Sequence, residues 1–167
     1  MRSSAASDVY KRQPLLDRED IGKDAQPIYN KIKMVDSTTV VQHDIFTNQI
    51  AYLRILFDAK YVPNDLVPYI GLLSTVLGYV DTEKNSFLEL SNEINIHTGG
   101  INTFISTYVK KNDITNYKPV LAFKIKVLYQ ELGVAMELLN EIIHESKLGD
   151  SKRMLEILME IKSRLQM

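Results

Sequence analysis

The chain has 167 residues, with 20 Lys+Arg against 21 Asp+Glu, and its composition is typical of one globular domain. Its formal charge of −1 gives no bulk field that would attract nucleic acid or anionic lipid. It contains no cysteine, which excludes disulfides, thiol nucleophiles and thiolate metal sites from this chain.

Residues 1–13 (MRSSAASDVYKRQ) are small, polar and basic and show no periodicity. They lack the apolar stretch of a secretory signal, and no run in the chain reaches the roughly 18–20 apolar residues that span a bilayer. Their arginines and serines would suit a mitochondrial-type presequence, but residues 9–13 resemble translated adapter sequence. We interpret 1–13 as a non-native leader, and we expect a cytoplasmic protein with neither a nucleic-acid nor a membrane partner.

Residues 14–37 are polar and contain Pro27, which predicts an extended lead-in or the end of a linker. The domain itself is expected over residues 38–167. It opens with two β-branched and aromatic runs, 38–46 (TTVVQHDIF) and 50–57 (IAYLRILF), which predict a β-hairpin. The second run is apolar at both odd and even positions, which indicates a strand covered on both faces or one inside a larger assembly.

The apolar period then becomes helical over residues 63–80 and again over 86–96. Pro68 is tolerated only in the first turns of the first helix. Ser86 and Glu89 have the spacing of a capping box at the start of the second. Gly99 and Gly100 supply its stop.

A second pair of strands and a second pair of helices follow. Residues 101–109 are strand-like, 110–118 form a polar turn, and 119–129 alternate between apolar side chains and lysines. Two helices finish the chain, separated by Gly149 and Asp150. The last helix has an a/d-like seam. The expected order is β-β-α-α-β-β-α-α, which favours an α+β fold with an antiparallel sheet and helices on one face.

No motif in the chain predicts a catalytic, cofactor-binding or metal site. The three histidines, His43, His97 and His144, are too far apart in sequence to form a metal pair. His144 and Glu145 begin like H-E-x-x-H, but the position of the second ligand is Leu148, and the inverted motif H-x-x-E-H is absent. We expect surface or capping roles for all three histidines.

The remaining polar groups have structural interpretations. Gly99 and Gly100 end a helix, whereas a phosphate loop begins one. The acidic pairs have the spacing of helix surfaces and caps, and the basic pairs that of a solvated strand face. These pairs are Asp81 with Glu83, Glu89 with Glu93, Lys110 with Lys111, and Lys124 with Lys126.

Four segments nevertheless carry a resemblance: LLDREDIGKDAQPIYNKIK (15–33), HDIFTNQIAYLRILFD (43–58), VPNDLVPYIGLLSTVLGYVDTE (62–83) and LSNEINIHTGGI (90–101). They resemble the insulinase-like, or pitrilysin-type, zinc metallopeptidases. More narrowly, they resemble the bacterial form of the presequence-protease branch. The resemblance extends over residues 15–167.

The resemblance implies a parent chain with four homologous α+β domains in two halves, which close around an unfolded peptide. The zinc motif lies in the first domain, and this segment corresponds to the end of the linker and the first domain of the non-catalytic half. It implies zinc in the parent and no cofactor here, and partners that are the remaining domains and the peptide in the enclosed chamber. No functional residue carries over, and we expect the segment to stop before the last elements of the family domain, leaving apolar surface uncovered.

Three hypotheses therefore stand. In the first, the chain is a non-catalytic, chamber-forming part of a zinc metalloendopeptidase that degrades short unstructured peptides. In the second, it is a stand-alone interaction or dimerisation domain of the same fold. The third, a new hydrolase, would require a charged cleft around His43 or His97.

Overall fold

The structure is a computed structural model that describes residues 17–22 and 27–166. The leader predicted at 1–13 lies outside these residues. The chain divides into two compact units, within residues 1–45 and 46–167. Among the helices of the described residues, none combines the length and the apolar character that a bilayer crossing requires.

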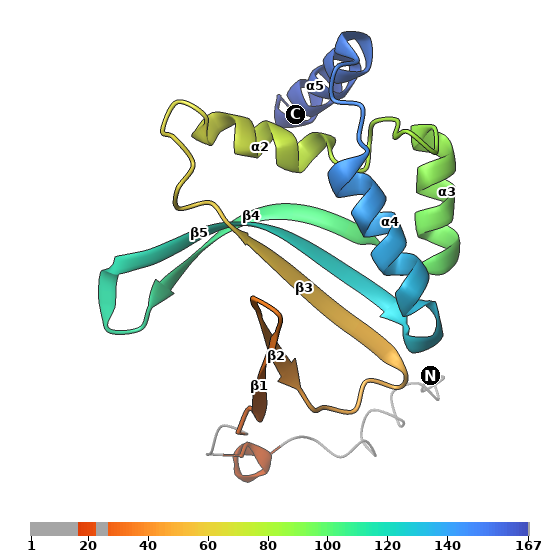
Figure 1. Ribbon diagram of the computed structural model, residues 1–167. Coiled ribbons are helices and arrows are strands. Elements are labelled where there is room, and N and C mark those ends of the chain that lie inside the picture. Colours follow the sequence, from red (N-terminus) through yellow and green to blue (C-terminus); the bar gives the residue numbers. More distant parts are fainter. Residues whose placement is uncertain (1–16, 23–26, 167) are drawn as a thin grey trace, which may run out of the picture. The chain divides into compact units, whose positions relative to one another are not determined.

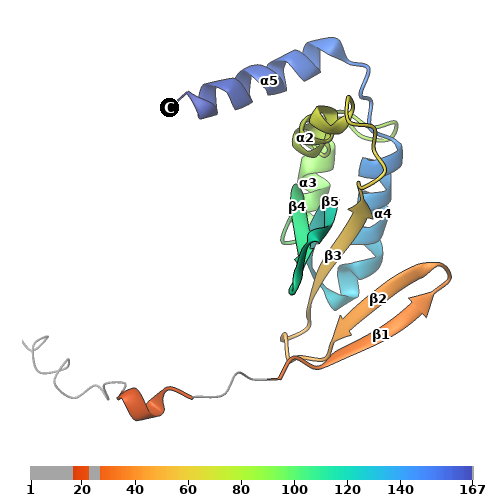
Figure 2. The ribbon, with the colours of Figure 1, turned by 90° about the vertical axis from the view of Figure 1, so that its left-hand side faces the viewer.

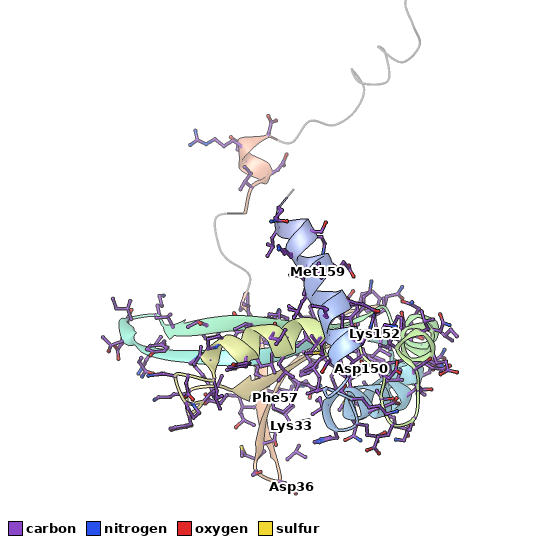
Figure 3. All side chains as sticks on the ribbon, turned by 90° about the horizontal axis from the view of Figure 1, so that it is seen from above. Lys33, Asp36, Phe57, Asp150, Lys152 and Met159 are labelled. Carbon is purple, nitrogen blue, oxygen red and sulfur yellow. The ribbon has the colours of Figure 1, made fainter. Side chains whose placement is uncertain are left out.

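The first unit contains a 3-10 turn, η1 (Arg18–Asp20), and a hairpin of β1 (Asn30–Val35) and β2 (Thr38–His43). All the residues of both strands are exposed. At the tip, Asp36 has a φ of 50°, a conformation that Asp tolerates better than most residues. Figure 3 labels it together with Lys33. Lys31 pairs with Asp44 at 2.8 Å across the hairpin end.

The predicted pairing of 38–46 with 50–57 is therefore wrong. Residues 38–43 pair with 30–35, which were expected to be part of an extended lead-in. The chain does turn at Asn48 and Gln49, which have φ values of 50° and 64°. The strand that follows has a different partner, because its apolar residues are buried against helices far along the chain.

The second unit is built on a three-stranded antiparallel sheet in the order β3-β5-β4, with β3 Ile50–Asp58, β4 Ile101–Lys110 and β5 Asp113–Leu128. The predicted polar turn at 110–118 is also wrong. The turn is confined to residues 111–112, and 113–118 extend β5 as an exposed part of the β4–β5 hairpin. An exposed two-stranded ribbon can carry polar residues on both faces, which is why the composition resembled a loop.

Helices cover one face of this sheet, as predicted. They are α2 (Val67–Val76), α3 (Phe87–His97) and α4 (Leu132–His144), and the short η2 (Tyr129–Glu131) joins β5 to α4. Figure 1 shows the three helices around the sheet, and Figure 2 gives the view along its edge. The core consists of odd-numbered residues of β5 packed against apolar side chains of the helices: Phe123, Ile125, Val127, Leu77, Leu90, Ala135, Leu138, Leu139 and Ile142. The fold is α+β, with one strand more than the predicted order because of β1.

The last helix, α5 (Ser151–Leu165), begins as predicted, with Asp150 accepting hydrogen bonds from the backbone N–H groups of residues 152 and 153. It packs on α2 through Met154, Ile157 and Ile161. The predicted seam is only partly used, because Leu158 and Leu165 remain exposed. Figure 3 shows Met159 on the part of α5 that projects beyond the other helices. This helix therefore presents apolar side chains to solvent.

The capping box at the start of α3 yields a pH prediction. Hydrogen bonds from the Ser86 hydroxyl and then from its backbone N–H lower the pKa of Glu89. A carboxyl whose pKa is lower in the folded state stabilises the fold above its unfolded-state pKa, and that contribution disappears as the pH falls through the folded-state pKa. We expect an NMR titration to give a Glu89 pKa below the ordinary glutamate value of about 4.3.

A matched substitution tests the cause of this shift. Ser86→Ala removes the hydroxyl and should move the pKa of Glu89 back toward its ordinary value. Ser91→Ala, on the same helix and away from the cap, should leave it unchanged. An equal effect of the two substitutions would contradict the capping-box explanation.

Candidate functional site

The structure does not bring the three histidines together. His43 ends β2 and His144 ends α4, and both are exposed. His97 ends α3, where its Nδ1 lies 2.9 Å from Glu131 Oε2 and its Nε2 lies 3.5 Å from Glu93 Oε2. A cation at a helix C-terminus is favourable, and the bond to Glu131 ties α3 to the segment before α4.

A pocket of about 380 Å³ lies beside His97, between the end of α3 and the ends of β3 and β5. It does not have the donor set of a zinc site. The two nitrogens of His97 face different carboxylates, so one metal ion could not bind the ring and both acids. Within residues 17–22 and 27–166, no three metal-ligating side chains gather at one point. The zinc of the implied parent does not fit the residues of this segment.

Gly99 and Gly100 hold the backbone close to β5. The N–H of Gly99 donates to the carbonyl of Lys126 at 2.7 Å, and a Cβ on Gly99 would lie 3.1 Å from Cδ of Lys126. Gly100 has a φ of +114°, which an L side chain rarely adopts. The glycine pair ends α3 and fixes the stem of Lys126 from one side.

The acidic pairs act mainly at caps and loops. Asp81 accepts a hydrogen bond from the backbone N–H of Phe87 at 2.8 Å, at the first residue of α3. The backbone N–H of Glu83 donates to the carbonyl of Glu145. Glu89 completes the capping box and Glu93 contacts His97. These contacts give the carboxylates structural roles.

A buried polar cluster escaped the sequence analysis. Glu141 on α4 is 5% exposed and Thr82 is 1% exposed. One carboxylate oxygen of Glu141 accepts hydrogen bonds from the Thr82 hydroxyl and from Nδ2 of Asn85. The cluster attaches the α2–α3 connection to α4. Its sequence signal is weak, because a glutamate in an amphipathic helix is usually exposed.

The helix-free face of the sheet is the most distinctive surface of the second unit. Even-numbered residues of β3 and β5 share this face, and Arg54 on β3 is directly opposite Lys124 on β5. Tyr52 is likewise opposite Lys126. Of the side chains on this face, Tyr52 is 59% exposed and Leu56 is 46% exposed. The strand predicted to be covered on both faces is thus covered on only one.

Aromatic side chains surround the three cations. The Arg54 guanidinium lies 5.8 Å from the centre of the Phe104 ring and donates to the hydroxyl of Tyr108 at 3.3 Å. The Lys126 ammonium lies 6.0 Å from the centre of the Tyr52 ring. We call this surface, comprising Arg54, Lys124 and Lys126 with Tyr52, Phe104 and Tyr108, the basic face.

Comparison with known proteins identifies the family. The family model that describes the associated domain of metallopeptidase subfamily 16C matches residues 4–167. The chain belongs to this peptidase-associated family. The resemblance to the presequence-protease branch of the insulinase-like metallopeptidases is thereby confirmed, and the chain is a non-catalytic, peptidase-associated segment.

The similar curated proteins are much longer than this chain. Protein HypA of Clostridium perfringens is 38% identical over 153 residues, which cover 92% of this chain and 16% of that protein. The chloroplastic/mitochondrial presequence protease 1 of Arabidopsis thaliana is 24% identical over 154 residues, covering 92% and 14%. The mitochondrial presequence protease of Saccharomyces cerevisiae is 25% identical over 168 residues, covering 92% and 17%. The chain spans about a sixth of the length of these relatives.

Proposed function

We propose that this chain is a chamber-forming segment of a cytoplasmic zinc metalloendopeptidase that degrades short unstructured peptides, and that it has no activity of its own. The zinc site of the parent lies outside this segment. The remaining domains of the same parent chain are its partners, and the peptide substrate is enclosed between them. The observation that carries the proposal is the family match over residues 4–167, in a chain that spans only about a sixth of its relatives.

The surfaces of the chain support a role inside a larger assembly. On the β1–β2 hairpin, Ile32 is directly opposite Val41 and both are exposed. An isolated two-stranded hairpin is only marginally stable in water, so an apolar hairpin face gains from being covered. The exposed side chains of Leu155, Leu158 and Met159 on α5 make a second apolar surface of this kind.

The alternative is a stand-alone interaction or dimerisation domain, and the exposed apolar side chains of α5 favour it. A helix with unpartnered apolar residues can pair with a second copy of itself. In that case the 167-residue chain should sediment as a dimer, and Leu155→Glu with Met159→Glu should convert it to a monomer.

Expression of the uninterrupted reading frame tests the proposal. We expect the parent chain to cleave an unstructured fluorogenic peptide in a zinc-dependent manner, and the 167-residue chain alone to cleave none. Removal of residues 46–166 from the parent should abolish cleavage while its zinc content stays unchanged. A parent without peptidase activity would contradict the proposal, as would cleavage by the 167-residue chain that is lost on His97→Ala.

A further inference from the structure

The basic face concentrates positive charge in a chain whose formal charge is −1. Arg54 and Lys124 are direct cross-strand partners, and like charges in this position destabilise a sheet. Lys126 lies two positions along β5 on the same face. In the part of the chain that the structure describes, none of these three cations forms an ion pair with an acidic side chain. An anion bound across them would relieve the repulsion.

The two outer cations are held in place by the fold. Arg54 is fixed by Phe104 and by the Tyr108 hydroxyl, and the stem of Lys126 lies against Gly99. Positioned cations lose less side-chain entropy on binding than free ones do. The open sheet face therefore has the character of a prepared surface for carboxylates.

We propose that the basic face binds the acidic side chains of an extended, unfolded peptide. This inference rests on the proposed function and adds a substrate class to it. The parent would favour peptides that carry Asp and Glu, and would disfavour the Arg-rich, acid-poor composition of organellar transit peptides. Side chains on one face of an extended chain repeat every two residues, as do Lys124 and Lys126.

The same geometry disfavours a nucleic acid as the occupant. Proteins that bind single strands present free aromatic rings on which the bases stack. Here the rings of Phe104 and Tyr52 already lie beneath cations of the same chain, and the Tyr108 hydroxyl is engaged by Arg54. The basic face therefore offers point charges for carboxylates and few free ring faces.

Fluorescence anisotropy on the 167-residue chain tests this assignment. The probes are three labelled unstructured peptides of one length that differ only in carrying Glu, Gln or Lys at alternate positions. We expect the Glu peptide to bind most tightly, and its affinity to fall on going from about 10 mM to about 150 mM salt as screening grows. Lys124→Gln with Lys126→Gln should weaken its binding about tenfold at low salt.

The matched control is Lys147→Gln with Lys152→Gln, which makes the same change in charge at exposed positions outside the sheet. Urea unfolding should show that both double variants are as stable as the original chain. Equal affinity for the Glu and Gln peptides would overturn the inference, as would equal weakening by the two double variants. Tighter binding of a single-stranded oligonucleotide, lost with Lys124 and Lys126, would assign the face to nucleic acid instead.

This binding test and the activity test of the parent can fail independently. Selective binding of the Glu peptide by a chain whose parent cleaves nothing would contradict the proposed function and leave the surface intact. An active parent whose 167-residue segment ignores peptide charge would contradict the surface alone.

Discussion

Phe123→Ala is expected to lower the free energy of unfolding of the second unit by about 3–5 kcal/mol, the usual cost of removing a buried aromatic side chain. Phe123 is 1% exposed and lies in the central strand of the sheet. Its ring meets that of Phe57 edge to face, with the ring centres 5.8 Å apart. Alanine leaves a cavity between the sheet and the helices that this rigid layer can only partly fill. Urea unfolding followed by circular dichroism measures the effect.

Phe46→Ala is the matched control, because the same side chain at position 46 is 93% exposed. It should change the unfolding free energy by less than about 0.5 kcal/mol, as is usual for surface substitutions. Similar losses in the two variants would mean that Phe123 does not occupy the core. Such a result would also undermine the assignment of the even-numbered residues to the open face.

The local features of the fold could be predicted from the sequence because their signals lie within a few residues. The capping box of Ser86 and Glu89 and the cap at Asp150 were read from short spacings and appear as predicted. The alternation along β5 correctly separated Phe123, on the core face, from Lys124 on the open face.

The strand pairing could not be predicted in the same way, because it depends on contacts between distant segments. Residues 38–43 and 50–57 are neighbours in sequence with a turn between them, and both have high strand propensity. Their register is decided by what each strand can bury. For β3 that is the helical layer, whose residues follow much later in the chain. Propensity alone could not choose between these partners.

The basic face shows the same limit for function. Lys124 and Lys126 were predicted to lie on a solvated strand face, and they do. Their pairing with Arg54 and Tyr52 comes from the register of β3 on β5, which the sequence does not reveal. Glu141 was missed for the opposite reason, because a charged residue between apolar positions of α4 gives no sign of being buried.

The buried cluster around Glu141 carries the second large prediction. Thr82→Val keeps the shape of the side chain but removes the hydroxyl that donates to the carboxylate. A buried acceptor that loses a donor cannot regain it from water, so the variant should be destabilised by about 1–3 kcal/mol in urea unfolding. Thr107→Val, at an exposed position of β4, is the matched control and should have almost no effect.

A double-mutant cycle with Glu141→Gln distinguishes a carboxylate effect from simple packing. The neutral amide still accepts a hydrogen bond, but losing a donor costs a neutral group less than a charged one. Thr82→Val should therefore be less destabilising in the Glu141→Gln background than in the original chain, and the difference is the coupling energy between the two residues. An identical cost in both backgrounds would show that Thr82 contributes through packing alone, and that the α2–α3 connection is not held to α4 through Glu141.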